Sequence, residues 1–347
     1  MSRVLITGCS GEVGHSLIDM LVASGRDEIV GVDLRPLNHR LPAGANVQHH
    51  QLDITDSSAM QALGEKYQFE RIFHLAAILS TGGELDPIRA HEVNVDGSLN
   101  LLTLARSQAE KRNAPVRFIF PSTIAVYGIP SEREKQAAGS VSEDQFLSPI
   151  TMYGNNKLYV EKIGRYFQNY YRFLDAKEVR DRVDFRSVRL PGVISAFTEP
   201  TGGTSDYGPE MLHAAAKNVP YSCFVEREAR LPFMAMPDAV RAIMVLAEAP
   251  KEKLTRLVYN ITALSMSAEE IRAEVLKYFP NAKIDYSINA KRNSIVSSWP
   301  GDVDDTHARR DWGWKPQYDK ERAFRDYLIP AIRGKYENVE VRKAATS

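Results

Sequence analysis

Short apolar runs alternate with longer stretches of helical periodicity through the first half of the chain. Runs rich in β-branched and aromatic residues predict strands at residues 4–7, 29–33, 47–50, 71–77, 116–122 and 184–191. Apolar side chains three and four positions apart predict helices at residues 12–24, 90–106 and 151–174. This alternation predicts an α/β fold, a doubly wound parallel sheet (Rossmann) with helices on both faces.

The pattern changes after Pro191-Gly192. Loops rich in Gly, Pro and Thr alternate there with helices predicted at residues 208–217, 238–249 and 268–279. We therefore expect a large domain over residues 1–190, a smaller C-terminal lobe over residues 191–335 with segments that return to the large domain, and a tail over residues 336–347.

Two stretches interrupt this organisation. Residues 131–149 begin with the charge run Glu-Arg-Glu-Lys, which predicts a solvated loop or a short surface helix, with a functional lid as the alternative. Residues 170–184 form a second irregular stretch. The sequence leaves the role of both stretches open.

The composition of the chain excludes several classes of binding partner. The 44 Lys and Arg residues balance 44 Asp and Glu residues, so no long-range field would attract nucleic acid or an anionic membrane. No apolar run reaches about 18 residues, and the start of the chain does not resemble a secretory leader. Two cysteines are too few for a disulfide framework, and no cluster has the spacing of metal ligands. We expect a cytoplasmic protein that binds a small molecule and no metal.

The first predicted strand runs directly into the turn Thr-Gly-Cys-Ser-Gly-Glu-Val-Gly, which opens into a helix. Gly8, Gly11 and Gly14 allow the tight turn, the close approach of a pyrophosphate and close packing of helix on strand. The second strand ends at Asp33, whose carboxylate can accept the ribose hydroxyls and repels a 2′-phosphate. The turn predicts a dinucleotide site that prefers NAD, whereas Arg35, which can hold a phosphate, favours NADP.

Short or small side chains follow the next two strands. Asp53-Ile54 can meet the adenine edge, and Leu75-Ala76-Ala77 leaves room for the cofactor backbone to pass. Asn94 lies on the following helix, either as a surface amide or with a structural or proton-relay role.

Tyr153 and Lys157 lie four positions apart, so a helix places them on one face. A phenol has an ordinary pKa of about 10, and a nearby ammonium favours the phenolate, which can act as a general base. Ser122 and Thr123 end the fifth strand, where a hydroxyl can bond the reacting oxygen of a substrate. This set predicts hydride transfer from a secondary alcohol on a small polar substrate to a nicotinamide.

The motifs TGCSGEVG, HLAA, PSTIAVYG and YGNNK resemble, in this order, the extended short-chain dehydrogenase/reductase superfamily, an epimerase/dehydratase family, over nearly the whole chain. The later segments RLPGVIS, PTGGTSDYGPEM, PFMAMPDAVRAIM and SSWPGDVDDTHARRDWGW are similar to the short-chain type of L-threonine 3-dehydrogenase. This resemblance implies NAD-dependent oxidation of L-threonine to 2-amino-3-oxobutyrate without a metal.

The resemblance also implies roles for single residues. Tyr153 is the base, Lys157 supports it, and Ser122 and Thr123 are the hydroxyl partners. Substrate contacts are expected at Ser80, Thr81, Ser122, Thr123, Tyr153, Thr204, Ser205 and Trp299. With the positions above, the expected cofactor contacts are Gly8, Ser10, Gly11, Glu12, Val13, Gly14, Asp33, Asp53, Ile54, Leu75, Ala76, Ala77, Asn94, Tyr153, Lys157 and Pro191. Thr204-Ser205 departs from the doubled threonine that is usual in the family.

Two other functions stay open. A nucleotide-sugar 4-epimerase or dehydrogenase would use the same base and cofactor on a larger ligand. A non-catalytic NAD-sensing regulatory protein would need the fold but not Tyr153 and Lys157. As in relatives, the helices at residues 90–106 and 151–174 could form the interface of a homodimer.

Overall fold

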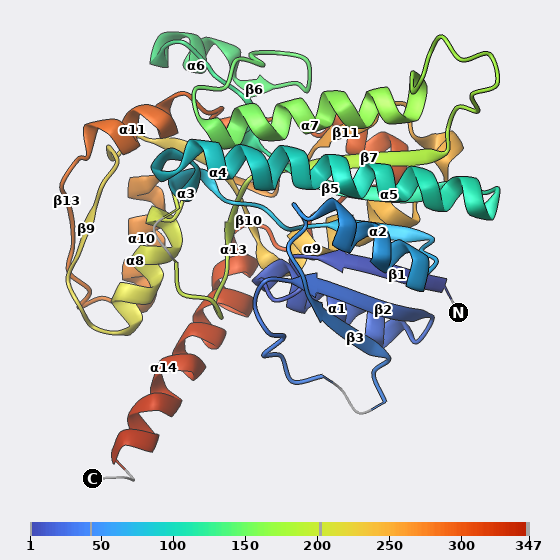
Figure 1. Cartoon of the computed structure of the whole chain (residues 1–347). Coiled ribbons are helices and arrows are strands. Elements are labelled where there is room, and N and C mark those ends of the chain that lie inside the picture. The colour runs from blue at the N-terminus through green and yellow to red at the C-terminus, as the bar shows by residue number, and fades with distance from the viewer. Residues whose placement is uncertain (1, 42–43, 201–202, 345–347) are drawn as a thin grey trace. The chain divides into compact units, whose positions relative to one another are not determined.

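The predicted strands form one sheet in the computed structural model, which describes residues 2–41, 44–200 and 203–344 (Figure 1). The order of its seven strands is β11-β7-β5-β4-β1-β2-β3. They are β1 (Ser2–Thr7), β2 (Asp27–Asp33), β3 (Val47–Gln51), β4 (Arg71–His74), β5 (Val116–Thr123), β7 (Val183–Leu190) and β11 (Val258–Asn260). The pairs from β3 through β2, β1 and β4 to β5 are parallel. This confirms the predicted α/β fold.

The strand order reverses beside β1. The chain moves from β1 outward to β2 and β3, and then returns to β4 on the other side of β1. The last residues of these two neighbours, Thr7 and His74, are paired. Sheets of this kind bind ligands outside the carboxyl ends of the strands at such a reversal. The turn after Thr7 and the loop after His74 therefore border the expected ligand site.

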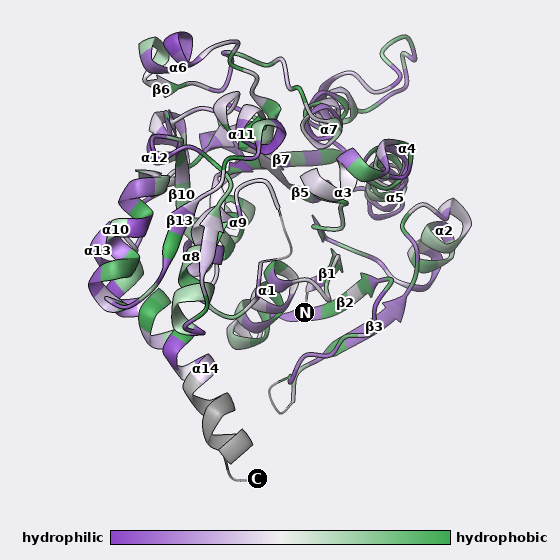
Figure 2. Cartoon of the chain, turned by 90° about the vertical axis from the view of Figure 1, so that its left-hand side faces the viewer, coloured by the Kyte–Doolittle hydropathy of each residue, from purple (hydrophilic) through white to green (hydrophobic). Residues whose placement is uncertain are grey.

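Helices cover both faces of this sheet (Figure 2). One face carries α2 (Ser57–Lys66), α5 (Gly97–Arg112) and α7 (Met152–Asn169), and the other carries α1 (Glu12–Ser24). Alternate residues of a strand point to opposite faces, so Phe118 and Phe120 of β5 share the first face. Both rings contact Phe185 of β7, where Phe118 is stacked and Phe120 tilted, with ring centroids 5.9 and 6.1 Å from that of Phe185. Burial of each such side chain stabilises the fold by about 1.5–3 kcal/mol.

Two predicted helices have different ends in the structure. Residues 90–106 belong to a longer stretch made of α4 (Pro87–His91), a π-helical turn (Glu92–Asp96) and α5. Asp86 caps α4 at its start. α7 ends at Asn169, before the predicted end at residue 174, because its C-cap Tyr170 has a φ of −135° and Arg172 a positive φ of 45°, both outside the α-helical region.

The residues cluster into two compact units. The first comprises Met1–Val126, Thr151–Arg189 and Val240–Tyr259, and the second comprises Tyr127–Ile150, Leu190–Ala239 and Asn260–Ser347. The chain thus passes between the units near residue 190 and at four further places, near residues 126, 150, 239 and 259.

The second unit contains smaller sheets and several helices. A three-stranded sheet joins β8 (Gly192–Ile194), β10 (Arg230–Ala235) and β12 (Leu264–Ser267), and two short pairs join β9 (Tyr221–Cys223) to β13 (Ile284–Tyr286) and β6 (Ser140–Val141) to β14 (Asp302–Val303). The helices are α6 (Glu132–Ala138), α8 (Tyr207–Ala216), α10 (Ala268–Tyr278), α11 (Ala290–Ser297), α12 (Thr306–Trp312), α13 (Lys320–Arg322) and α14 (Ile329–Ala344). α9 (Met236–Glu248) begins in this unit and ends in the first. The three helices predicted in this half correspond to α8, α9 and α10.

The charged stretch at residues 131–149 contains the short helix α6, which is one of its predicted forms. Ser131 caps this helix by accepting from the backbone N–H of Glu134 at 3.2 Å. Lys135 differs from the expected solvated face, because it is buried and donates to the Val296 carbonyl at 3.3 Å. Burial lowers the pKa of Lys135 to about 8, opposed by the charge of Glu132.

Across the described ranges, we find no helix with both the length and the apolar content needed to cross a membrane. The cytoplasmic location stays a prediction from the sequence.

Candidate active site

The turn after β1 accepts only glycine at two positions. Gly8 has a φ of +73°, and a Cβ there would lie 2.6 Å from the backbone nitrogen of Ala76. A Cβ on Gly14 would lie 2.5 Å from the carbonyl oxygen of Gly8, so the first turn of α1 packs directly on the loop. The helix begins at Glu12 after Gly11 as N-cap. The start of a helix presents N–H groups and a partial positive charge, which suit a phosphate.

Asp33 lies beside this turn at the end of β2. One carboxylate oxygen accepts from the backbone N–H of Ser10 and the other from that of Arg35, both at 3.0 Å. The Arg35 guanidinium folds back over the turn, with Nε 3.5 Å from the Asp33 carboxylate and Nη2 donating to the Ser10 carbonyl at 3.3 Å. The carboxylate is therefore held at the edge of the glycine turn.

Protein groups also hold Asp53 and Ile54. The Asp53 carboxylate pairs with the Arg89 guanidinium at 2.8 Å and accepts from the Thr55 N–H at 2.9 Å. Ile54 is buried against Gly97, where a Cβ would lie 2.6 Å from its Cδ1 atom. The expected contacts of both residues with adenine stay predictions.

A chain of hydrogen bonds joins the ends of β1 and β4, the strands beside which the strand order reverses. The Thr7 hydroxyl lies 2.7 Å from Nδ1 of His74, and Nε2 lies 2.8 Å from the Ser98 hydroxyl. Because Ser98 donates its hydrogen to the Asn94 carbonyl at 2.5 Å, His74 donates from Nε2 and accepts from Thr7 at Nδ1. Burial lowers the pKa of His74 to about 3, so the ring is neutral and fills both roles.

Asn94 fixes the loop that follows β4. That strand ends at His74, so Leu75-Ala76-Ala77 is loop rather than the end of the predicted strand. The Asn94 side chain accepts from the N–H of Ile78 at 2.8 Å and donates to its carbonyl at 2.9 Å. Asn94 is 3% exposed, which excludes the surface amide and favours the structural role.

α7 carries the predicted tyrosine and lysine. Thr151 caps its first turn. Lys157 Nζ lies 5.8 Å from the ring centroid of Tyr153, donates to the Pro121 carbonyl at 2.8 Å, and lies 4.3 Å from the ring centroid of Phe120. Tyr153 and Lys157 therefore lie together next to the end of β5.

Burial disfavours the charged forms of both Tyr153 and Lys157. It raises the pKa of the Tyr153 phenol to about 12, while a hydrogen bond with the Thr123 hydroxyl acts in the opposite direction. It lowers the pKa of Lys157 to about 7, opposed by the negative charge of Glu161. The phenol is protonated at neutral pH, and the ammonium is close to its titration point. Charge on Lys157 is what favours the phenolate.

Ser122 and Thr123 have different surroundings because neighbouring strand residues point to opposite faces. The Thr123 hydroxyl bonds Tyr153. Ser122 is 2% exposed, and its hydroxyl donates to the Glu161 carboxylate at 2.6 Å. Thr123 therefore bonds the base while Glu161 holds Ser122, and the substrate contacts expected for both residues stay predictions.

Ser80 and Thr81 begin α3 (Ser80–Leu85), which packs against the start of α7. A Cβ on Gly83 would lie 3.7 Å from the backbone nitrogen of Tyr153. Ser80 is buried and Thr81 is exposed. The structure therefore places Ser80 and Thr81 on the helix that borders Tyr153.

Thr204 and Ser205 lie in the second unit, directly before α8; residues 201–202 of the same loop are outside the described residues. Thr204 is buried and Ser205 is half-buried. The N–H of Gly203 donates to the Asp206 carboxylate at 2.6 Å, and the Gly203 carbonyl accepts from the Arg292 guanidinium at 2.7 Å. Arg292 thus fastens the loop and brings a positive charge to it.

Trp299 and Pro191 are the other predicted residues of this unit. Both are buried, with Pro191 between β7 and β8. Trp299 is 4% exposed, and among the described residues its indole N–H has no hydrogen-bond partner. An unsatisfied buried donor costs about 1–3 kcal/mol, so this N–H is suited to a ligand oxygen.

Three residues near these sites were not predicted from the sequence. Glu161 could have been found, because it lies four positions after Lys157 and therefore on the same helix face. Arg189 lies in the buried strand β7, where a charge signals a buried partner. Arg292 had no local signal, since its contact with Gly203 joins residues far apart in the sequence.

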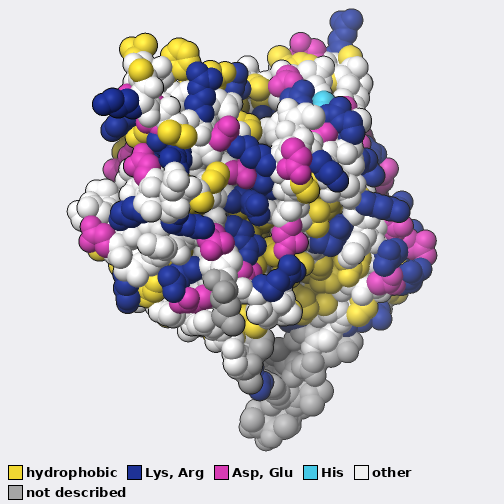
Figure 3. All heavy atoms as spheres, turned by 90° about the vertical axis from the view of Figure 1, so that its right-hand side faces the viewer, with side chains coloured by type: hydrophobic (Ala, Val, Ile, Leu, Met, Phe, Trp, Pro, Cys, Tyr) yellow, Lys and Arg dark blue, Asp and Glu magenta, His cyan; other side chains and the backbone are white. Residues whose placement is uncertain are grey.

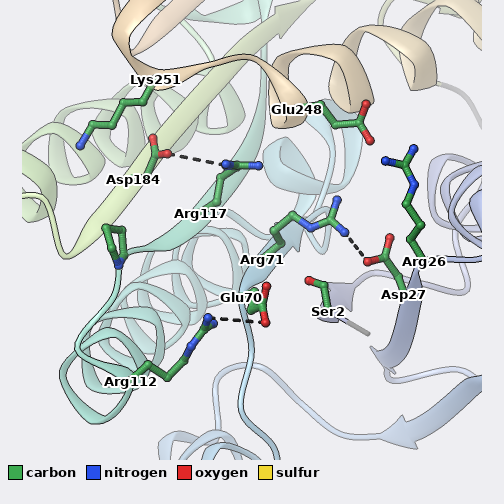
Figure 4. A pocket seen from close by; sticks show the side chains of 11 residues that line it. Ser2, Arg26, Asp27, Glu70, Arg71, Arg112, Arg117, Asp184, Glu248 and Lys251 are labelled. Atoms are coloured by element: carbon green, nitrogen blue, oxygen red, sulfur yellow. Dashed lines mark hydrogen bonds and ion pairs between the residues drawn. The ribbon is translucent and has the colours of Figure 1, made fainter.

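A hollow lies in the first unit, at the amino ends of the strands. Its volume is about 740 Å³, and Figure 3 shows Lys and Arg side chains gathered on this face. The close-up in Figure 4 shows Arg117 paired with Asp184, Arg71 with Asp27 and Arg112 with Glu70. Arg117 also donates to the Ala247 carbonyl of α9 at 2.6 Å. Helix carbonyl ends attract cations, so we interpret this hollow as a structural ion-pair network.

Comparisons with known proteins agree with this geometry. The model of the NAD dependent epimerase/dehydratase family matches residues 4–262. The mitochondrial L-threonine 3-dehydrogenase of Bos taurus is 35% identical over 319 residues, which cover 91% of this chain and 79% of that protein. The crystal structure of L-threonine dehydrogenase from Phytophthora infestans is 36% identical with a TM-score of 0.81, covering 95% of this chain and 99% of that one. A monomeric L-threonine 3-dehydrogenase from a metagenome is 32% identical, with the same TM-score and coverage.

Proposed function

Because the chain belongs to the NAD dependent epimerase/dehydratase family, we propose that it oxidises the 3-hydroxyl of L-threonine with NAD to give 2-amino-3-oxobutyrate. One observation carries this proposal: the Tyr153 phenol is hydrogen-bonded to the Thr123 hydroxyl, and Lys157 lies beside it on the same helix face. The similarity to proteins named as L-threonine dehydrogenases supports the choice of substrate.

The residues around the glycine turn fit a nicotinamide dinucleotide. A Cβ at Gly8 or Gly14 would fill the space against the turn, and the start of α1 suits the pyrophosphate. Asp33, whose carboxylate is held at the edge of this turn, would accept the ribose hydroxyls and repel a 2′-phosphate, which supports NAD over NADP. Lys157, whose Nζ lies next to Tyr153, is suited to the second ribose.

Oxidation removes a hydride from C3 of threonine and a proton from the hydroxyl on that carbon. The nicotinamide cofactor, when bound, accepts the hydride. Tyr153 as phenolate accepts the proton, and the Thr123 hydroxyl bonds the same substrate oxygen. Lys157 supports this step because its positive charge stabilises the phenolate. A positioned base of this kind contributes about 10²- to 10⁴-fold to the rate.

The loop before α8 suits the carboxylate of an amino acid. The hydroxyls of Thr204 and Ser205 supply donors, and Arg292 supplies a positive charge beside them through its bond to Gly203, while the Gly203 N–H is taken by the Asp206 carboxylate. The indole N–H of Trp299 is a further donor. This donor set supports a small anionic substrate.

The family includes epimerases, so sugar-nucleotide epimerisation is the second candidate. A screen of NADH formation with L-threonine, other β-hydroxy amino acids and sugar nucleotides distinguishes the dehydrogenase function from the epimerase function. We expect NADH to form with L-threonine and to be absent with sugar nucleotides. If no β-hydroxy amino acid gave NADH while a sugar nucleotide was epimerised without net reduction of NAD, the epimerase function would replace the proposed one.

We also propose a homodimer formed through the helices of the first unit. α3, α4 and α7 expose large apolar or aromatic side chains, among them Leu85, Ile88, Tyr159 and Tyr166. A second copy of the same face would bury them, as exposed apolar patches often mark interfaces. One relative is described by its name as monomeric. Light scattering of the purified protein distinguishes the two states, and replacing Leu85 and Ile88 by Glu should dissociate the dimer.

A further inference from the structure

α7 carries a further polar residue, Glu161, on the face of Tyr153 and Lys157. Glu161 lies one turn beyond Lys157 and is 3% exposed. Its neighbours Ser122 and Arg189 are each 2% exposed. Charged side chains are almost never this deeply buried unless they are paired.

The hydrogen bonds around Glu161 all run in one direction. Arg189 donates from Nε to Oε1 at 2.9 Å and from Nη2 to Oε2 at 2.6 Å. Ser122 donates to Oε1 at 2.6 Å. Since every contact brings a hydrogen and the guanidinium is always charged, Glu161 accepts as an ionised carboxylate.

The Ser122 bond connects this carboxylate to the backbone beneath the base. The residue before Ser122 is Pro121, whose carbonyl accepts from Lys157 at 2.8 Å. The residue after it is Thr123, which bonds Tyr153. Holding Ser122 therefore holds the partners of both Lys157 and Tyr153 in position along β5.

The charges that face Lys157 come from several elements. His74 on β4 is neutral, because burial lowers its pKa to about 3. Tyr153 on α7 is protonated at neutral pH, and Arg189 on β7 carries a positive charge that is paired with Glu161 and offsets part of its effect. Burial lowers the pKa of Lys157, and Glu161 is the group that opposes this effect.

We propose that Glu161, clamped by Arg189 and Ser122, is a positioning residue that keeps Lys157 charged and holds the Pro121–Thr123 backbone in place for catalysis by Tyr153. This inference rests on the proposed dehydrogenase function. A merely structural ion pair would stabilise the fold without acting on Lys157.

The first test is a double-mutant cycle that needs no activity. We compare the unfolding of wild type, Glu161→Gln, Lys157→Met and the double variant in denaturant at pH 6 and at pH 10. At pH 6, where Lys157 is charged, we expect the two residues to be coupled by at least about tenfold in the unfolding equilibrium constant. At pH 10 the coupling should disappear. Equal coupling at both pH values, or none at pH 6, would overturn the inference.

The second test is the pH profile of NADH formation with L-threonine. In Glu161→Gln the basic limb should move to lower pH by about 0.5–2 units, the effect of one charge at about 6 Å. Glu161→Asp, which keeps the charge, should keep the basic limb. The matched control is Asp184→Asn, because Asp184 makes the same two-pronged bond to a buried arginine, Arg186, at 3.1 and 2.7 Å. It should lose stability without moving the limb.

Ser122→Ala tests the positioning of the backbone separately and leaves the ion pair intact, so it is expected to fold. It should lower kcat by about tenfold without shifting the basic limb, the loss expected for one hydrogen bond of about 1.4 kcal/mol. Full kcat in Ser122→Ala, or an unshifted limb in Glu161→Gln, would overturn the inference. If wild type did not oxidise L-threonine but Glu161 and Lys157 were still coupled at pH 6, the proposed function would be refuted and the inference about Glu161 would stand.

Discussion

Replacing Asp33 by Asn removes one negative charge from the edge of the glycine turn with little change in shape. In the native carboxylate, each oxygen accepts one backbone N–H, from Ser10 and from Arg35, at 3.0 Å. A carboxylate has about four acceptor positions, which leaves two for the two ribose hydroxyls of NAD. In the variant, an amide nitrogen faces one of these N–H groups and cannot accept a hydroxyl.

Loss of the carboxylate reduces the preference for NAD in two ways: it removes an acceptor for a ribose hydroxyl, and it removes the repulsion of a 2′-phosphate. Losing one charge-assisted bond weakens NAD binding by about 1.5–3 kcal/mol, or about 10- to 150-fold. A 2′-phosphate charge about 4 Å from the carboxylate costs about 1 kcal/mol in water and about 4 kcal/mol at an effective dielectric constant of about 20. Wild type should therefore bind NAD at least about tenfold more tightly than NADP, and Asp33→Asn should reduce that ratio at least about tenfold.

Calorimetric titration of wild type and variant with NAD and NADP measures all four dissociation constants, and thermal unfolding checks that the variant is folded. Arg35→Ala is the control, because it removes the guanidinium and keeps the backbone N–H that bonds Asp33. It should change NAD affinity by less than about threefold, as expected for an exposed charge. A wild type that bound NADP as tightly as NAD, or an unchanged ratio in Asp33→Asn, would refute the reasoning and assign the selection to Arg35.

Three further predictions follow from the site. Tyr153→Phe should keep NAD affinity in calorimetry and lower turnover at least about 100-fold; a variant with a third of wild-type turnover would place the base elsewhere. Replacing Thr204 and Ser205 together by Ala should raise the KM for L-threonine at least about tenfold without changing NAD affinity, and Arg292→Met should act in the same direction; unchanged kinetics would show that this loop does not bind the carboxylate. Because burial lowers the pKa of Lys157 from its ordinary value to about 7, the folded protein binds fewer protons than the unfolded chain between about pH 7 and pH 10.5. Wild type should therefore gain stability relative to Lys157→Met as the pH rises through that window, and a constant difference in denaturant unfolding would contradict the lowered pKa.

Features that depend on near neighbours in the chain could be predicted from the sequence. The strands and helices of the first unit follow from periodicity, because the spacing of apolar residues reports which face each element buries. The glycine turn and the Tyr153/Lys157 pair are local in the same sense. Gly8 requires a positive φ in a tight turn, and residues four apart on a helix share a face whatever surrounds them.

Features that depend on contacts between distant segments were decided only by the tertiary structure. Ser122 and Thr123 are equivalent as a sequence pair, and only the position of Glu161 on α7 decides that the Ser122 hydroxyl donates to its carboxylate. Lys135 belongs to a run of charged residues, yet its side chain is covered by residues near Val296. A hydrophobicity pattern specifies which face of an element is buried. The partner of a buried polar side chain depends instead on which elements pack together, and this packing is a property of the whole fold.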